Sequence, residues 1–201
     1  AFWYLQQVEG YRKDVVLIEK ELMRRTWYPY QLEKWYPQLT HKSTSETAAF
    51  MKDLELFEAD LNYNPMSIQM NFVNLFNSYI DKNIDSIPVF LTLDILQSEP
   101  DIAKNYHKIP YGFAFKLSKQ PETLSIDKYQ ININKLYKSL ATSNDHLHQG
   151  LRQTAAVSLL NIARYGIATE QKDKAKEYYL KAKKLDPQNM DINILSREFG
   201  F

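Results

Sequence analysis

The stretch from Phe2 to Tyr28 constrains the fold more than any other part of the chain. Apolar residues between Phe2 and Val8 have roughly helical spacing, and Gly10 follows, a residue type that commonly ends helices. Val15 to Ile18 is then an unbroken apolar run rich in β-branched residues, which is typical of a strand covered on both faces in a parallel sheet. The order helix, turn, buried strand predicts the second half of a βαβ unit.

The first strand of that unit is missing from the sequence. Ala1 stands directly before the predicted helix, with no Met and no capping residue. We therefore expect the chain to be a piece of a longer protein. The predicted fold is an α/β domain over residues 1–120, with a truncated, Rossmann-like, mostly parallel sheet, followed by a helical tail over residues 121–201.

Composition sets limits on function. With 201 residues, the chain can form one substantial domain or two small ones. The formal net charge of +1 argues against a nucleic-acid binder that works by bulk electrostatics. There is no Cys, which excludes disulfides and thiolate metal sites. No apolar run reaches the roughly 20 residues that span a bilayer, so any membrane segment must lie outside this piece.

Hydrophobic periodicity and helix-capping residues predict further elements. Asn64 and Pro65 should cap and open a strongly amphipathic helix that ends near residues 81–83. Ser43 and Glu46 have the spacing of a capping box before another helix. The remaining predicted elements are short helices over 30–36 and 100–107, a helix over 46–62, and buried strands over 87–93 and 112–117.

The tail has a recognisable helical hairpin over residues 157–189. Ala175, Tyr179, Ala182 and Pro187 occupy small, aromatic, small and Pro positions, while Gly166 stands where an aromatic residue is usual. This pattern resembles a single tetratricopeptide repeat. Such a repeat needs neighbours to bury its faces, and we expect helices over 126–140 and 190–199 to supply them.

The opening stretch carries a second resemblance. Trp3-Tyr4-Leu5-Gln6, Val8-Glu9-Gly10, Arg12, Asp14-Val15 and Trp27-Tyr28 match the segment after the membrane spans of a bacterial membrane protein family. That family was long of unknown function and is now grouped with GT-C-type protein O-glycosyltransferases, which are similar to an animal protein O-mannosyltransferase. Lys13 replaces the usual Pro, and Glu19-Lys20-Glu21 stands where the family has Asn-Leu-Ser.

The resemblance implies a location and a role. It implies the extracytoplasmic, periplasmic C-terminal part of an integral inner-membrane protein, whose catalytic carboxylate lies in the membrane half. This piece would then be non-catalytic, with no cofactor, and would position an acceptor protein or support the membrane half of the same polypeptide. Whether the parent protein is an enzyme stays open at this point.

Candidate ligand-binding residues lie near the end of the predicted second strand. Glu19 is there, with other carboxylates at Glu9, Asp14 and Glu21, where ligands of α/β sheets commonly bind. Trp27 and Tyr28 begin an aromatic cluster that also holds Tyr30, Trp35 and Tyr36. Aromatic platforms bind sugars and peptides, although such side chains also simply cover a sheet edge. We expect no catalytic residue here.

The tail offers a peptide-binding candidate in Asn161 and Arg164, which lie on the first helix of the hairpin. The second helix is rich in lysine, for which a solvated face is the simplest reading. His146 and His148 beside Asp145 suggest a metal site only weakly, because two-apart side chains in a loop need not converge. We therefore expect no metal.

Two other function classes remain open. One is a tetratricopeptide-type protein-interaction module, which predicts more repeats after Phe201. The other is a small-ligand-binding α/β domain, which predicts a glycine-rich turn before Ala1. The glycosyltransferase reading predicts membrane spans before Ala1.

Overall fold

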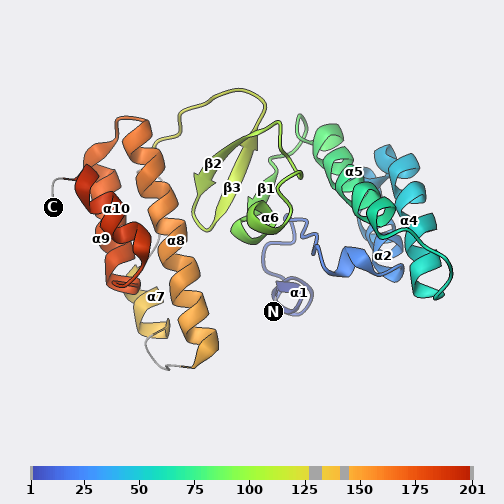
Figure 1. Ribbon diagram of the computed structural model, residues 1–201, viewed down its shortest axis with the longest axis horizontal. Helices are drawn as coiled ribbons and strands as arrows, with labels where there is room; N and C mark the ends of the chain where they lie inside the picture. Colours follow the sequence, from blue (N-terminus) through green and yellow to red (C-terminus); the bar gives the residue numbers. More distant parts are fainter. Residues whose placement is uncertain (1, 127–132, 141–144, 200–201) are drawn as a thin grey trace. The chain divides into compact units, whose positions relative to one another are not determined.

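The computed structural model describes residues 2–126, 133–140 and 145–199, which are mostly helical (Figure 1). The chain divides into two compact units, Ala1–Ile87 and Pro88–Phe201, called here the N-terminal and C-terminal units. The predicted domains 1–120 and 121–201 stay a prediction.

The N-terminal unit contains helices and no strand among its described residues. The longest two, α4 and α5, pack against each other. In chain order the elements are α1 (Phe2–Gln7), η1 (Leu22–Arg24), α2 (Trp27–Trp35), α3 (Pro37–Thr40), η2 (His41–Ser43), α4 (Thr44–Glu58) and α5 (Pro65–Asn83).

Helix α5 forms as its sequence predicts. Asn64 Oδ1 accepts hydrogen bonds from the backbone N–H groups of Met66 (3.0 Å) and Ser67 (3.4 Å), and Pro65 occupies the first turn. The apolar residues at i, i+3 and i+4 spacing are all buried: Ile68, Phe72, Leu75, Phe76, Tyr79 and Ile80. Both the cap and the buried face of this helix are therefore confirmed.

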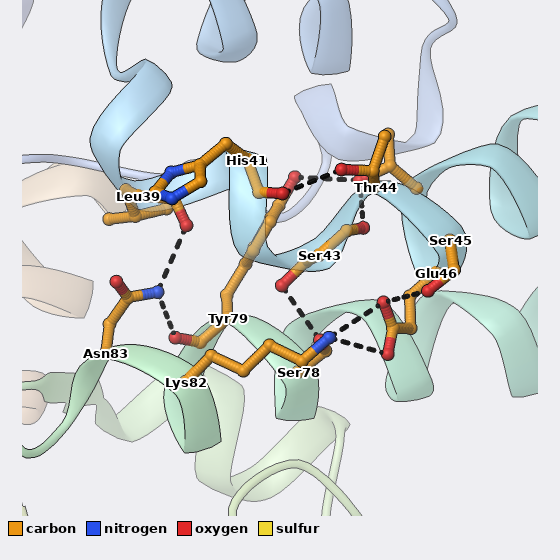
Figure 2. Close-up of polar contacts among 11 residues, drawn as sticks. Leu39, His41, Ser43, Thr44, Ser45, Glu46, Ser78, Tyr79, Lys82 and Asn83 are labelled. Carbon is orange, nitrogen blue, oxygen red and sulfur yellow. Dashed lines mark hydrogen bonds and ion pairs between the residues drawn. The ribbon is translucent and has the colours of Figure 1, made fainter.

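A polar network joins α5 to the segment before α4 (Figure 2). Asn83 Nδ2 donates to the carbonyl oxygens of Leu39 (3.1 Å) and Tyr79 (2.9 Å). Ser78 Oγ donates to Ser43 Oγ at 2.8 Å, and both serines are buried. Ser43 therefore occupies the N-cap position of α4 as predicted, but the capping-box hydrogen bond is wrong because the Ser43 hydroxyl bonds to Ser78 on α5 instead.

The predicted strand at Val15–Ile18 is wrong. These residues are irregular and half-buried, and no strand pairs with them in the described part of the chain. The apolar run does indicate burial, since each of these residues is half-buried, but half-burial does not require a strand. The helix before it is confirmed, since α1 ends at Gln7 and Gly10 has the left-handed φ of +66°.

The sheet lies in the C-terminal unit and is antiparallel. Its strands β1 (Phe90–Thr92), β2 (His107–Tyr111) and β3 (Ala114–Ser118) have the order β1-β3-β2, and α6 (Leu93–Ser98) follows β1 directly. Phe90 pairs with Lys116, and Ile109 pairs with Lys116 from the other side. A truncated, Rossmann-like, mostly parallel sheet is thus contradicted: the chain is mostly helical, with one small antiparallel sheet.

The hairpin of β2 and β3 explains part of that error. Gly112 and Phe113 form a two-residue turn, and Gly112 has φ +63°, as the first central position of a tight hairpin turn requires. Strand β3 confirms the prediction of a strand over 112–117. The prediction of a helix over 100–107 is wrong, because turns occupy 100–105 and β2 begins at His107.

The rest of the C-terminal unit is helical, with α7 (Ile133–Leu140), α8 (His146–Ala168), α9 (Lys172–Leu185) and α10 (Met190–Glu198). Residues 127–132 of the predicted helix over 126–140 lie outside the described residues. Helices α8 and α9 form the predicted hairpin, and Ala175, Tyr179 and Ala182 are fully buried in its core. The small residues allow the close helix approach that the sequence pattern predicts.

Side chains of the hairpin hold the irregular segment from Glu122 to Ile126. Each bond joins a side chain to a main-chain group that no strand neighbour pairs. Tyr165 Oη accepts from the Leu124 N–H (2.9 Å) and donates to the Glu122 carbonyl (3.1 Å). Gln171 accepts from the Ile126 N–H through Oε1 (2.9 Å) and donates to the Leu124 carbonyl through Nε2 (3.1 Å). Tyr178 Oη donates to the Ile126 carbonyl (3.0 Å).

Gly166 makes room for this segment. A Cβ atom at Gly166 would lie 2.7 Å from Ile126 Cδ1 and 2.9 Å from Ala175 Cβ. A tetratricopeptide repeat usually has an aromatic residue at this position. Here Ile126 and the closely packed helix α9 fill the space that such a side chain would occupy.

We predict that Gly166→Ala destabilises the C-terminal unit by about 1–2 kcal/mol, because overpacking exceeds the helix-propensity gain. Gly150→Ala in the same helix meets nothing within 4 Å and should stabilise by about 0.5–1 kcal/mol. Urea unfolding followed by circular dichroism compares the two variants. Equal stabilisation by both would contradict close packing at Gly166.

A second prediction concerns acid stability. Hydrogen bonds from Lys82 Nζ and Ser45 Oγ lower the pKa of Glu46 from 4.5 to about 2. Because the folded-state pKa is depressed, this stabilisation is complete above pH 4.5 and is lost as the pH falls toward 2. Glu46→Gln should lower the free energy of unfolding by about 0.2–1 kcal/mol at pH 7, as is usual for partly exposed pairs, and by nothing near pH 2.

Tryptophan fluorescence during urea unfolding measures this effect, since all three tryptophans lie in the N-terminal unit. Glu33→Gln, at an exposed position on α2, is the matched control. A pH-independent difference between Glu46→Gln and the unsubstituted protein would contradict the role of the ion pair.

Candidate functional site

Gln6 fixes the backbone that follows α1. This side chain is only 3% exposed, and its Nε2 donates to the carbonyl oxygens of Arg12 (2.8 Å) and Val15 (2.6 Å). Both amide hydrogens are therefore used on the main chain. The turn that contains Lys13 is held against the C-terminal half of α1.

Tyr28 fixes the other end of the same segment. Its hydroxyl accepts a hydrogen bond from the Glu19 N–H at 3.0 Å and donates to the Leu17 carbonyl at 3.4 Å. Tyr28 is fully buried, and burial raises the pKa of its phenol. Glu19 Oε2 accepts from the Leu22 N–H at 2.7 Å, where η1 begins. Two of the three predicted ligand-binding residues, Glu19 and Tyr28, thus support the local backbone.

Aromatic rings pack against one another around Tyr28. The Trp3 ring lies 6.1 Å from the rings of both Tyr28 and Trp35, measured between centroids. Trp27 packs edge-on against Tyr28 at 5.5 Å, and Trp35 packs edge-on against Tyr36 at 6.3 Å. Four residues of the predicted aromatic cluster therefore lie together, with Tyr28 buried at the centre and Trp27 and Trp35 partly exposed at opposite ends of α2. The fifth, Tyr30, is exposed and has no ring contact within the described ranges.

A hollow of about 420 Å³ opens beside one end of this cluster. It lies within the N-terminal unit and has the size of many small-ligand sites. Two glutamines, two lysines and two aromatic residues line it: Gln6, Gln7, Lys13, Lys34, Trp35 and Tyr36.

The hollow shifts the candidate site from one end of α2 to the other. Trp27 is 48% exposed but does not line it, whereas Trp35, which is 42% exposed, does. Reasoning from sequence included Trp35 in the cluster but did not select Gln6, Lys13 or Lys34. The sequence marked Lys13 only as a departure from the pattern that the opening stretch resembles.

The other carboxylates near the segment have separate local partners. Glu9 accepts from Tyr4 Oη at 2.8 Å, and Lys20 pairs with Glu21 at 3.2 Å. Asp14 accepts two hydrogen bonds of 2.8 Å from Arg12, which lower the pKa of that carboxyl. These groups do not converge on one substrate position.

The predicted peptide-binding residues also have structural contacts. Arg164 pairs with Asp191 of α10 at 2.8 Å and donates to Asn161 Oδ1 at 3.4 Å. Arg164 therefore connects α8 to α10, and Asn161 bonds to Arg164 within α8. A peptide using this face would compete with α10 for the guanidinium.

The histidine pair belongs to a helix start. Asp145 caps α8 by accepting from the backbone N–H of His148 at 2.9 Å, and His148 Nδ1 lies 2.9 Å from the same carboxylate. Within residues 2–126, 133–140 and 145–199, no three His, Asp or Glu side chains are grouped as metal ligands. Over the same ranges, no helix has the length and apolarity that crossing a membrane requires.

Comparison of the chain with protein families, with curated proteins and with solved structures finds no match.

We predict that Tyr28→Phe destabilises the N-terminal unit by about 1–3 kcal/mol, because it leaves a buried N–H and a carbonyl without their partner. Tyr30→Phe is the control, since among the described residues its exposed hydroxyl bonds only to Glu55, at 3.2 Å, and its loss should cost under about 0.5 kcal/mol. Urea unfolding followed by tryptophan fluorescence compares them. Equal stability of the two variants would contradict a structural role for the Tyr28 hydroxyl.

Proposed function

We propose that the N-terminal unit binds a saccharide in the hollow beside Trp35, as a non-catalytic part of a membrane-embedded GT-C-type glycosyltransferase. On this proposal the chain lies on the extracytoplasmic side of a bacterial inner membrane. Its partners are the membrane half of the same polypeptide and a glycan or glycosylated acceptor protein, which the hollow would help to position.

The observation that carries the proposal is the composition of the hollow. Trp35 and Tyr36 supply apolar ring surface with polar edges, which suits the apolar faces of a sugar ring. Gln7 offers both donors and an acceptor for hydroxyl groups. Gln6 has both amide hydrogens bonded to the main chain, so the group it can offer a ligand is its carbonyl oxygen.

The position of the hollow links it to the family resemblance. Gln6 belongs to the matching Trp3-Tyr4-Leu5-Gln6 sequence, and Lys13 is a point of departure from the family. The resembling stretch thus supplies one wall of the proposed site. A peptide site at Asn161 and Arg164 is less well supported, because Asp191 already occupies the guanidinium.

The proposal predicts which tryptophan senses the ligand. Titration of the ¹⁵N-labelled chain with a panel of oligosaccharides should shift the indole N–H signal of Trp35 and leave that of Trp27 in place. Trp35→Ala should weaken binding by about 1 kcal/mol or more, which is about fivefold in Kd, through loss of ring contact.

Trp27→Ala is the matched control, because it removes a similarly exposed tryptophan at the other end of α2. Trp35→Phe keeps a ring and should retain part of the affinity even where Trp35→Ala perturbs the Trp3 contact. Loss of binding in Trp27→Ala with full binding in Trp35→Ala, or no saccharide binding at all, would contradict the proposal.

A further inference from the structure

The charge of the hollow narrows the class of ligand. Its described lining has two cationic side chains, Lys13 and Lys34, and no carboxylate. The whole chain is close to neutral, with a formal net charge of +1, so two lysines without an acid at one hollow are a local feature. A neutral sugar could accept hydrogen bonds from them but would leave their charge uncompensated.

Both lysines are available to a ligand. Neither side chain has a hydrogen bond or ion pair within the described ranges, and both are exposed. Two cationic residues nearby in the sequence are already paired: Arg12 with Asp14, and Lys20 with Glu21. Glu33 adjoins Lys34 on α2, but consecutive helical residues do not face each other.

We propose that the hollow selects a saccharide that carries an anionic group, either a carboxylate or a phosphate, bound between Lys13 and Lys34. This inference rests on the proposed function and adds the ligand's charge to it. A lysine ammonium is a compact cation with three donors and binds either anion without the planar fork of arginine. Trp35 and Tyr36 then hold the ring, and the lysines hold its charged substituent.

An acidic peptide would also satisfy two lysines, but it suits the site less well. Three of the six lining residues are the aromatic Trp35 and Tyr36 and the amide Gln7. Ring faces and an amide suit a sugar ring with hydroxyl groups better than an aspartate or glutamate side chain. The acidic peptide is therefore an outcome of the test rather than a second proposal.

The test compares ligands that differ only in charge. A glucose disaccharide, its counterpart ending in glucuronic acid and its 6-phosphate are titrated into the ¹⁵N-labelled chain at low salt. We expect an acidic form to bind about tenfold more tightly than the neutral disaccharide, from two partly exposed ion pairs. The preference should shrink as salt rises from 0.02 M to 0.5 M. Comparing the affinities of the glucuronic acid form and the 6-phosphate form shows whether the hollow prefers a carboxylate or a phosphate.

The matched variants are Lys13→Gln with Lys34→Gln, and Lys52→Gln on the exposed face of α4 as the control. The double variant should bind the acidic and neutral disaccharides equally, while the control keeps the preference. Equal binding of both sugars by the unsubstituted chain would overturn the charge inference and leave the saccharide site standing. Tighter binding of a Glu-rich peptide than of any sugar would overturn it in favour of a peptide, and no sugar binding would overturn the proposed function itself.

Discussion

Side-chain hydrogen bonds to main-chain groups hold two irregular segments of this chain in place, residues 12–19 and 122–126. Buried backbone N–H and C=O groups need partners, and in most α/β folds neighbouring strands provide them. Here Gln6 and Tyr28 bond to the main chain between Arg12 and Glu19, and Tyr165, Gln171 and Tyr178 bond to residues 122–126. Amide and phenol groups are suited to this role, since one Gln can bond to two carbonyls and one phenol can donate and accept.

The proposed site depends on the first of these arrangements. Gln6 holds the turn that carries Lys13, and the buried Tyr28 supports the Trp3 ring that contacts Trp35. The hydrogen bonds of Gln6 to the main chain therefore keep one wall of the hollow in place. The exposed side chains of Lys13, Lys34 and Trp35 remain accessible to a ligand. On our proposal, the same stretch that resembles a glycosyltransferase family gives this chain a charged saccharide site.

Local signals in the sequence predicted local structure well. Helix α5, with its Asn64 cap and buried face, could be predicted because capping and periodicity depend on neighbours within two turns. The strand at Val15–Ile18 could not be excluded, because an apolar run indicates burial but not whether strands or side chains pair its backbone. The β2–β3 hairpin was missed because the predicted strand over 112–117 begins at Gly112 and no strand is predicted directly before it, whereas Gly112 lies in the turn. Trp27 and Trp35 look alike in sequence, and although Lys34 precedes Trp35 directly, only folding brings Gln6 and Lys13 beside it.

Native-state hydrogen exchange at residues 15–19 tests the central claim most directly, namely that side chains rather than strands pair this backbone. We predict slow exchange of the Glu19 amide, which bonds to Tyr28, and fast, loop-like exchange of the Val16, Leu17 and Ile18 amides, for whose N–H groups no hydrogen bond is found among the described residues. Slow exchange across all of Val16 to Ile18 would indicate a paired strand and would contradict this account of the fold and of the hollow.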